Sequence, residues 1–298
     1  MNYHDPVLLQ ECIGGLKIDP EGIYVDLTFG GGGHSREIIK QLKGGHLFAF
    51  DQDKDAQMNL LQENNFTFIP HNFRYVKNFL RLHNALPVSG ILADLGISSY
   101  QIDEASRGFS IRNDGPLDMR MSEGIELTAK QIINTYSQEE LSRIFRNNAD
   151  LKEAWKMAKT IVAARTSETI NTISEFKNVV LKVAPRGKEN SFLARVFQAI
   201  RIEVNDEINA LHQMLAQMPN ILSEGGRLVV ISYHSLEDRP VKNLIRSGNI
   251  EGEIAKDFYG KPLVPFHAIT RKPIIPSDEE IARNPRARSA KLRIAEKM

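Results

Sequence analysis

The chain has 298 residues, of which 42% are hydrophobic and 25% are charged, and its formal net charge is +1. This length allows one large domain or two of moderate size. A single cysteine, Cys12, excludes an internal disulfide and fits a reducing compartment. No apolar run approaches the roughly 20 residues that span a bilayer, and the N-terminus lacks a basic-then-apolar export signal. We therefore expect a cytoplasmic globular protein.

Strands and helices alternate through the first hundred residues. Hydrophobic runs predict strands at 23–27, 46–51, 66–70 and 88–94, and the segments between them predict helices near 33–43, 53–63 and 73–82. Asp53 is suited to cap the second of these helices. Because parallel strands need helical crossovers, the alternation predicts an α/β fold with a parallel, Rossmann-like sheet.

Four consecutive glycines follow the first predicted strand. Gly30–Gly33 have no Cβ, so their backbone can take positive φ and lie against a ligand. The helix that opens at His34 and Ser35 leaves backbone N–H groups unpaired beside this turn. The arrangement is typical of the nucleotide-cofactor end of a Rossmann-like unit.

Three aspartates indicate which cofactor fits. Asp26, Asp51 and Asp94 each end a predicted strand, and ligands of open parallel sheets bind beyond the carboxyl ends of the strands. We expect the three carboxylates to ring one pocket, where a pyrophosphate would be repelled but a sulfonium and ribose hydroxyls would be stabilised. The pattern favours S-adenosylmethionine over NAD. The alternative for each aspartate alone is a helix N-cap.

The segment from Asp94 to Gln101 lies where amino-methyltransferases hold their target. An exocyclic amine is a weak nucleophile because its lone pair is delocalised, so an enzyme must accept its hydrogen bonds and orient it. Asp94, Ser98 and Ser99 are acceptors of the right type and are our candidate catalytic residues. Tyr100 is suited to stack on a flipped base. Alternatively, this loop contacts only the cofactor.

Two other chemistries fit the sequence poorly. Cytosine C5 methylation needs a cysteine nucleophile, and Cys12 lies upstream of the first core strand. Zinc-dependent deamination needs clustered Cys and His ligands, whereas the eight histidines are scattered. Nothing in the sequence calls for a metal.

The pattern changes after Asp94. An irregular segment at 95–124 precedes amphipathic helices near 128–134, 138–147, 150–165, 172–184 and 191–206. We interpret residues 107–206 as a helical insertion that forms a substrate-recognition lid beside the pocket. Basic side chains in these helices could serve that role, or could simply lie on a solvated face: Lys152, Lys156, Lys159, Arg165, Arg195 and Arg201.

Strand signal returns at Gly226–Ser232, followed by a helix near 236–247 and short β-prone runs at 262–270 and 289–295. Residues 1–106 and 207–298 are thus predicted to form the core domain. Residues 271–298 hold eight Lys and Arg against four Asp and Glu, a net charge of +4. Such a tail suggests a polyanionic partner, although a solvated terminal segment explains it equally well.

Seven motifs, in order along the chain, carry a resemblance to a known family. They are His4–Glu11, Thr28–Ser35, Asp94–Gln101, Arg107–Ser110, Asp114–Met121, Ile231–Arg239 and Arg286–Arg293. On these motifs the chain resembles the bacterial 16S rRNA (cytosine-N4)-methyltransferases of the MraW/RsmH family, nearly end to end.

The resemblance implies a class I S-adenosylmethionine-dependent methyltransferase core. It also implies methylation of the N4 amine of a cytidine in the decoding centre of 16S rRNA. The cofactor contacts that it implies are Gly32, Gly33, His34, Asp51, Phe73, Asp94 and Gln101. Four further polar residues of the matched motifs are candidates for the substrate side: His4, Asp114, Asp118 and His234.

Several alternatives remain open at the level of sequence. A DNA amino-methyltransferase would use the same chemistry, a non-catalytic assembly factor would use the cofactor only for stability, and a dinucleotide oxidoreductase is disfavoured by the acids. The Asn/Asp-Pro-Pro-aromatic motif of other amino-methyltransferases is absent. Arg107, Arg112 and the basic tail are candidate phosphate contacts. We expect the partner to be 16S rRNA within the small ribosomal subunit, and a homodimer is one possible assembly.

Overall fold

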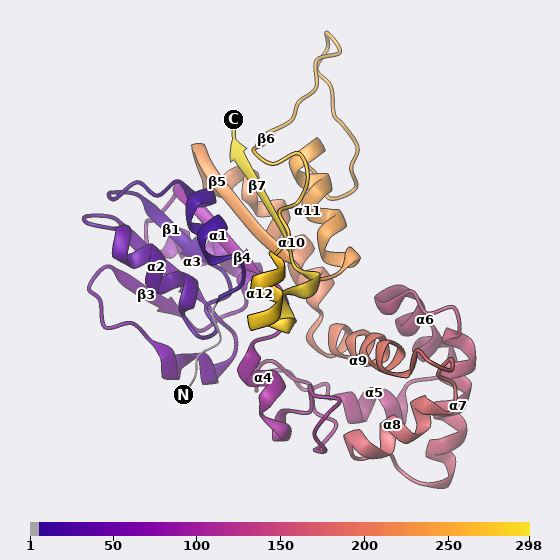
Figure 1. The fold of residues 1–298 in the computed structure, drawn as a ribbon. Helices are drawn as coiled ribbons and strands as arrows, with labels where there is room; N and C mark the ends of the chain where they lie inside the picture. The colour runs from indigo at the N-terminus through magenta and orange to yellow at the C-terminus, as the bar shows by residue number, and fades with distance from the viewer. Residues whose placement is uncertain (1–5) are drawn as a thin grey trace. The chain divides into compact units, whose positions relative to one another are not determined.

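The computed structural model describes residues 6–298, which divide into two compact units. The first unit comprises the chain up to Gly96 together with Ile208–Met298, and the second comprises Ile97–Glu207. In Figure 1 the first unit runs from indigo to magenta and returns in orange and yellow, and the second consists of the helices between. The predicted domain boundaries at 106/107 and 206/207 stay a prediction.

The first unit is built on a seven-stranded sheet. In chain order its strands are β1 (Ile23–Asp26), β2 (His46–Phe50), β3 (Phe66–Ile69), β4 (Val88–Asp94), β5 (Leu222–Ser232), β6 (Phe266–Ala268) and β7 (Lys291–Lys297). Their spatial order is β3-β2-β1-β4-β5-β7-β6. Strands β1 to β5 pair in parallel, as predicted, and β7 is antiparallel to both neighbours. The result is a mixed α/β sheet of Rossmann-like type.

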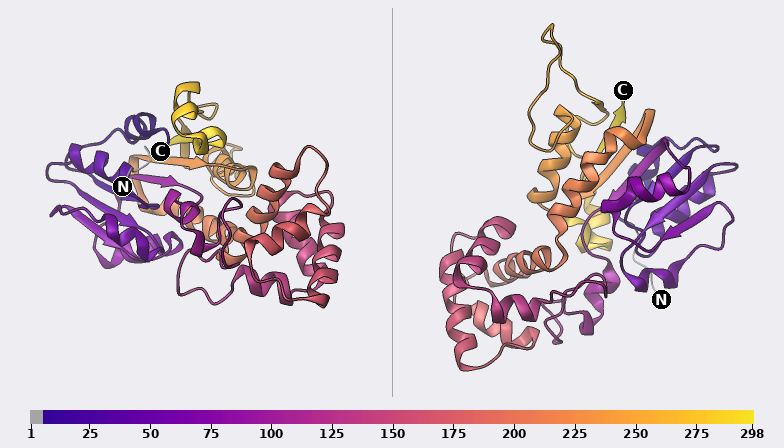
Figure 2. Two further views of the ribbon diagram at one scale, coloured as in Figure 1. Left: turned by 60° about the horizontal axis from the view of Figure 1, so that its bottom comes forward. Right: turned by 180° about the vertical axis from the view of Figure 1, so that it is seen from behind.

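Helices cover both faces of this sheet (Figures 1 and 2). They are α1 (Leu9–Leu16), α2 (Gly33–Gln41), α3 (Val76–Leu82), α10 (Glu207–Ile221), α11 (Ser235–Ser247) and α12 (Asp278–Arg283). Successive strand residues point to opposite faces, so Tyr24 packs in the cluster under α1 and α2, and Val25 packs in the cluster under α3, α10 and α11. The two cores hold the sheet between layers of helices.

The structure departs from the sequence-based elements at five places. The sequence pattern predicts none of the helices α1, α10 and α12. The helix expected at 53–63 is a 3-10 helix, η1 (Lys54–Asn59), although Asp53 does cap it by accepting the N–H of Asp55 at 3.0 Å. The segment 95–124, expected to be irregular, contains α4 (Ser99–Asp103) and a 3-10 turn, η3 (Ala105–Arg107).

The second unit has its own helical core. Its main helices are α5 (Ala129–Thr135), α6 (Gln138–Ala149), α7 (Ala154–Ser167), α8 (Ile173–Leu181) and α9 (Glu189–Asn205). Three of them begin with reciprocal capping boxes, at Thr128, Ser137 and Thr172. Their apolar faces meet in one cluster that includes the fully buried Phe145 and Phe176.

The basic C-terminal segment is part of the fold. Strand β7 lies between β5 and β6, and Arg293 forms a two-pronged ion pair with Asp238 of α11 at 2.7 and 3.0 Å. Arg227 of β5 pairs with Glu296 of β7 at 2.7 Å. Part of the positive charge of this tail is thus paired with an acidic side chain of the first unit. Among residues 6–298, no helix combines the length and apolar content needed to cross a membrane.

Candidate functional site

The candidate site lies at the carboxyl ends of β2, β1, β4 and β5. Strands β1, β2 and β3 are added outward on one side of β1, and β4 and β5 on its other side. Open α/β sheets bind ligands at such a switch in strand order, here between β1 and β4. Asp26 of β1 lies beside Leu92 of β4, and Asp94 of β4 lies beside Ile231 of β5. The ends of these strands therefore form one edge of the first unit.

The glycine turn between β1 and α2 is held in place by side chains from other parts of the chain. Gly32 has φ of +73° and forms the N-cap of α2, a conformation that favours glycine. A Cβ on Gly33 would lie 2.2 Å from Cγ of Pro6. Arg36 donates to the Gly31 carbonyl at 2.6 Å, and the Asn59 amide donates to the Gly30 carbonyl at 3.0 Å. The loop is thus fixed before any ligand arrives.

Asp51 follows β2 and faces the turn. Its Oδ2 accepts the N–H of Gly30 at 2.8 Å, and its Oδ1 accepts the N–H of Asp53 at 2.9 Å. Burial raises the pKa of this partly exposed carboxyl to about 6, against the lowering effect of the two N–H donors. A carboxylate offers about four acceptor positions. Asp51 therefore retains capacity for a pair of hydroxyl donors.

Asp26 has a different role from the one predicted. It is 1% exposed, its Oδ2 accepts the Ser35 hydroxyl at 2.6 Å, and its Oδ1 accepts the N–H of Thr28 at 3.1 Å. Burial raises the pKa of this carboxyl, and the Ser35 bond opposes the shift. Asp26 thus fixes the start of α2 on β1. The expectation that three carboxylates ring an open pocket is wrong for Asp26.

Asp94 ends β4 and is held on two sides. Its N–H donates to Oγ1 of Thr28 at 2.7 Å, and its Oδ1 accepts the hydroxyl of Tyr233 at 2.8 Å. Burial raises the pKa of Asp94 to about 6, while the charge of His34 and the Tyr233 hydrogen bond lower it. The carboxylate is oriented by its neighbours and remains partly exposed.

Tyr233, which lies within the motif Ile231–Arg239, is a functional candidate to which no role was assigned from the sequence. It follows β5 directly, so the rule that singled out the aspartates, position at a strand's carboxyl end, applies to it as well. Burial and the carboxylate of Asp94 raise the pKa of its hydroxyl well above the usual value. Its N–H donates to Oε2 of Glu237 at 2.7 Å. The hydroxyl stays protonated and donates to Asp94.

The remaining predicted cofactor residues of the first unit lie near the same edge. The His34 ring is 6% exposed, and its Nε2–H donates to the Val7 carbonyl at 3.0 Å. Phe73 opens a 3-10 turn, η2 (Phe73–Tyr75). The preceding Asn72 donates to Oε1 of Gln52 at 2.8 Å. This bond ties the Phe73 turn to the residue after Asp51.

Three predicted site residues begin the second unit. Ser98 and Gln101 form the capping box of α4: the Ser98 Oγ accepts the N–H of Gln101, and the Gln101 Oε1 accepts the N–H of Ser98. Gln101 is 5% exposed, whereas Tyr100 is 42% exposed. Ser99 is the first residue of α4. The side chains of Ser98 and Gln101 thus shape this short helix.

Other motif residues stabilise the second unit internally. Arg107 donates to the carbonyl of Arg120 at 3.1 Å, and Arg120 forms an ion pair with Asp118 at 2.8 Å. Asp114 accepts the N–H of Ser174 at the start of α8 at 2.9 Å. Two residues lie elsewhere. His234 precedes α11 in the first unit, with its Nε2 3.1 Å from Glu237 Oε1, and His4 falls outside the described residues.

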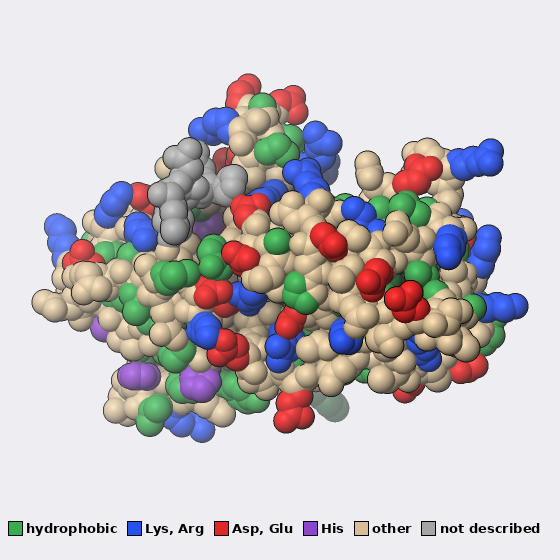
Figure 3. Space-filling view, turned by 90° about the horizontal axis from the view of Figure 1, so that it is seen from below, with side chains coloured by type: hydrophobic (Ala, Val, Ile, Leu, Met, Phe, Trp, Pro, Cys, Tyr) green, Lys and Arg blue, Asp and Glu red, His purple; other side chains and the backbone are tan. Residues whose placement is uncertain are grey.

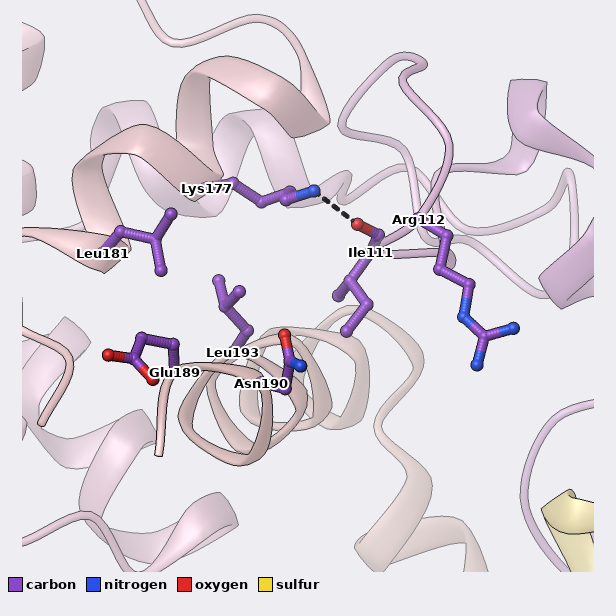
Figure 4. A pocket seen from close by; sticks show the side chains of 7 residues that line it. All are labelled: Ile111, Arg112, Lys177, Leu181, Glu189, Asn190 and Leu193. Carbon is purple, nitrogen blue, oxygen red and sulfur yellow. Dashed lines mark hydrogen bonds between the residues drawn. The ribbon is translucent and has the colours of Figure 1, made fainter. Parts of the chain in front are cut away.

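A cavity of about 750 Å³ lies within the second unit. Its walls are Ile111, Arg112, Lys177, Leu181, Glu189, Asn190 and Leu193. Lys177 donates to the Ile111 carbonyl at 2.6 Å, and Arg112 extends away from the leucines (Figure 4). Only Arg112 among the predicted contacts lines it. Within residues 6–298, no group of three His, Cys, Asp or Glu is arranged to hold a metal ion.

Comparison with known proteins gives the family. The model of the MraW methylase family matches residues 1–298. The chain belongs to this family. Its relatives include proteins named ribosomal RNA small subunit methyltransferase H. That of Amoebophilus asiaticus is 54% identical over 99% of this chain and 96% of its own length. That of Cytophaga hutchinsonii is 55% identical over 99% of both chains.

The family match therefore covers both units of the chain, which confirms the resemblance drawn from the seven motifs. Among solved structures, an rRNA methylase from Streptococcus thermophilus aligns over 97% of this chain and 93% of its own. The TM-score is 0.43 and the identity 12%, values too low to bear on the function of this chain.

Proposed function

We propose that this protein transfers a methyl group from S-adenosylmethionine to the exocyclic N4 amine of a cytidine in the decoding centre of 16S rRNA. The observation that carries the proposal is the family match over residues 1–298, together with relatives more than half identical that are named small-subunit rRNA methyltransferases. The N4 amine and the decoding centre rest on the resemblance to the family.

The chemistry of the carboxyl edge supports this cofactor. When bound, S-adenosylmethionine supplies an electrophilic methyl group on a sulfonium. Asp51 has acceptor capacity left for two ribose hydroxyls, and negative charge at Asp51 and Asp94 favours a nearby cation. The contacts we propose are Gly32, Gly33, His34, Asp51, Phe73, Asp94 and Gln101.

We propose that Asp94 binds and orients the reacting amine. Its carboxylate would accept an N–H of the cytosine amine, which keeps the nitrogen lone pair directed at the methyl carbon. With a pKa near 6, it would also accept the proton that the amine loses. Ser98 and Ser99, a few residues further along the chain, are proposed as additional acceptors. No covalent enzyme intermediate is needed.

The RNA partner follows from the same proposal. We propose that the substrate is 16S rRNA within the small ribosomal subunit, in the cytoplasm, with Arg112 and the basic C-terminal residues as phosphate contacts. A homodimer stays a prediction.

The test uses isotope-labelled S-adenosylmethionine and three polymers: small subunits lacking their native methylation, protein-free 16S rRNA and DNA. We expect label in the RNA of the subunits and none in DNA. Asp94→Asn should abolish labelling while retaining the fold, with Asp278→Asn, at an exposed position of α12, as the matched control. Preferential labelling of DNA, or full activity of Asp94→Asn, would contradict the proposal.

A further inference from the structure

The basic side chains of the helical unit fall into two groups. Arg165 donates to the Ile133 and Tyr136 carbonyls at 2.7 and 2.6 Å. Arg195 donates to the carbonyl of Ala149 at the end of α6, and Arg201 forms an ion pair with Glu207 at 2.8 Å. These arginines hold the fold of the unit together. The three basic residues Lys152, Lys156 and Lys159 differ from these arginines.

Lys156 and Lys159 lie on one exposed face of α7, and the exposed Lys152 precedes the helix. Helical residues are 100° apart around the axis, so Lys156 and Lys159 fall within about 100° of Trp155, and Lys152 precedes them in the adjoining turn. The buried residues Ala154, Met157, Ala158 and Ile161 point to the opposite side. None of the three ammonium groups forms an ion pair or hydrogen bond within residues 6–298. We call Lys152, Trp155, Lys156 and Lys159 the α7 patch.

Trp155 lies at the edge of this face. It is the single tryptophan of the chain, and its side chain is 51% exposed. A large aromatic surface left in water beside three unpaired positive charges has no evident role in the packing of the unit. Figure 3 shows both Lys and Arg and Asp and Glu side chains at the surface on the right-hand side of the view.

We propose that the α7 patch is a docking surface for a single-stranded segment of the substrate rRNA. A base stacks on the Trp155 indole, and the three lysines contact the flanking phosphates. This inference rests on the proposed function. It identifies a segment of the chain that binds the RNA substrate.

The composition of the patch favours RNA over a protein partner. Lysine is depleted from the centres of protein–protein interfaces, whereas aromatic platforms flanked by basic residues are the usual means of holding single-stranded nucleic acid. On the turn of α7 that carries the patch, the nearest acidic side chain in sequence is Glu153, which falls about 60° beyond Lys156 on the helical projection. With Glu153 counted, the segment from Lys152 to Lys159 carries a net charge of +2.

The single tryptophan makes the test direct. Protein-free 16S rRNA is titrated into the full-length protein, and tryptophan fluorescence then reports Trp155 alone, because the RNA contains no tryptophan. We expect quenching. Small subunits lacking the methyl group, whose proteins contribute fluorescence of their own, serve for the measurement of KM. Trp155→Ala should weaken RNA binding, and raise KM for the subunit, about 5- to 100-fold, the loss expected for one stacked base. Trp155→Phe should retain most of the affinity.

The lysines are tested through salt dependence. Replacing Lys152, Lys156 and Lys159 together by Gln should reduce the slope of log affinity against log salt by about 2, since each contact to a single strand contributes roughly 0.7. Lys182→Gln, an exposed lysine of the same unit outside the patch, should change nothing. Cofactor affinity and Tm are measured for every variant, so that loss of fold is recognised.

Three outcomes would overturn the inference. They are unchanged fluorescence with protein-free 16S rRNA, unchanged KM in Trp155→Ala, and crosslinking of a photoreactive phenylalanine at position 155 to a ribosomal protein instead of rRNA. If the wild-type protein methylates no RNA, the proposed function fails. If it does and the patch variants behave as wild type, only this inference fails.

Discussion

At the scale of single residues, the carboxyl edge holds two partly exposed acids, Asp51 and Asp94, whose pKa values burial raises to about 6. Each is held by hydrogen-bond donors from other strands or loops, so its orientation is set by the fold. Asp26, between them in the sheet, is fully buried and serves the packing of α2. Three similar residues in the sequence thus have different roles because their donors differ.

Removing the Tyr233 hydroxyl tests whether it positions Asp94. In Tyr233→Phe, the bond that lowers the pKa of Asp94 is lost, so that pKa rises further above 6. In the role proposed for Asp94, methyl transfer requires the charged carboxylate, so activity should fall as pH drops through the Asp94 pKa, and this acid limb should move to higher pH in the variant. We expect kcat at pH 7 to fall about tenfold, less than the roughly 10²–10⁴-fold of a direct general acid–base group, because Tyr233 acts through Asp94.

The pH profile of initial rates measures this, with Tyr75→Phe, an exposed tyrosine of the same unit, as control. An acid limb that stays where it is in the wild type would exclude a positioning role.

The raised pKa of Asp94 also has a cost in stability. The pKa of Asp94 in the folded protein, about 6, exceeds the usual 3.8. The contribution of Asp94 to the free energy of unfolding is therefore favourable below pH 4 and is lost as pH rises through 6. Asp94→Asn should therefore raise the free energy of unfolding at pH 7.5 by about 1–3 kcal/mol, because a pKa difference of one corresponds to about 1.4 kcal/mol. Near pH 3.8 it should have little effect. Urea unfolding at both pH values measures this, and equal effects at the two would contradict it.

Much of this site was predictable from residue order, and some was not. Position at a strand end marks Asp51 and Asp94 without any structure. Whether the carboxylate of Asp26 faces a ligand or the Ser35 hydroxyl depends on the direction of its side chain, which the sequence does not contain. Tyr233 was missed because its partner, Asp94, lies 139 positions away in the sequence.

At the scale of elements, the turn between β1 and α2 combines a required conformation with close packing. Gly32→Ala places a Cβ at positive φ and 2.9 Å from the Phe29 ring. We expect a loss of about 1–2 kcal/mol of stability together with at least tenfold weaker cofactor binding, measured by calorimetry. Gly187→Ala is the matched control, because Gly187 has φ of +75° with no atom near its Cβ position. Equal cofactor affinity in both variants would exclude a role of the turn in binding.

The predicted strands were confirmed because buried parallel strands are continuous apolar runs. Helix α10 was missed although it is long. Asp206, at φ of 51°, ends α9 one residue before α10 begins, and Pro219 lies inside α10. A helix that restarts immediately and contains a proline does not show the usual boundary signals.

At the scale of the whole molecule, each unit encloses its own apolar core. We expect two transitions in thermal unfolding. Phe176→Ala removes a fully buried ring from the core of the second unit, with a typical cost of about 3–5 kcal/mol. Calorimetry should show one transition lowered and the other retained. A single transition that shifts as a whole would contradict independent cores.

The division into an α/β part and a helical part could be anticipated from the change in periodicity after Asp94. No composition shift marks Ile97, where the second compact unit begins, and α4 follows β4 after only four residues, Leu95–Ser98.

The most direct test of the account is the identity of the methylated nucleoside. Small subunits that lack their native methylation are incubated with the protein and labelled S-adenosylmethionine, and the RNA is digested to nucleosides and separated. The account predicts that the label elutes as N4-methylcytidine. Label in any other nucleoside, or none at all from protein that binds the cofactor, would contradict it.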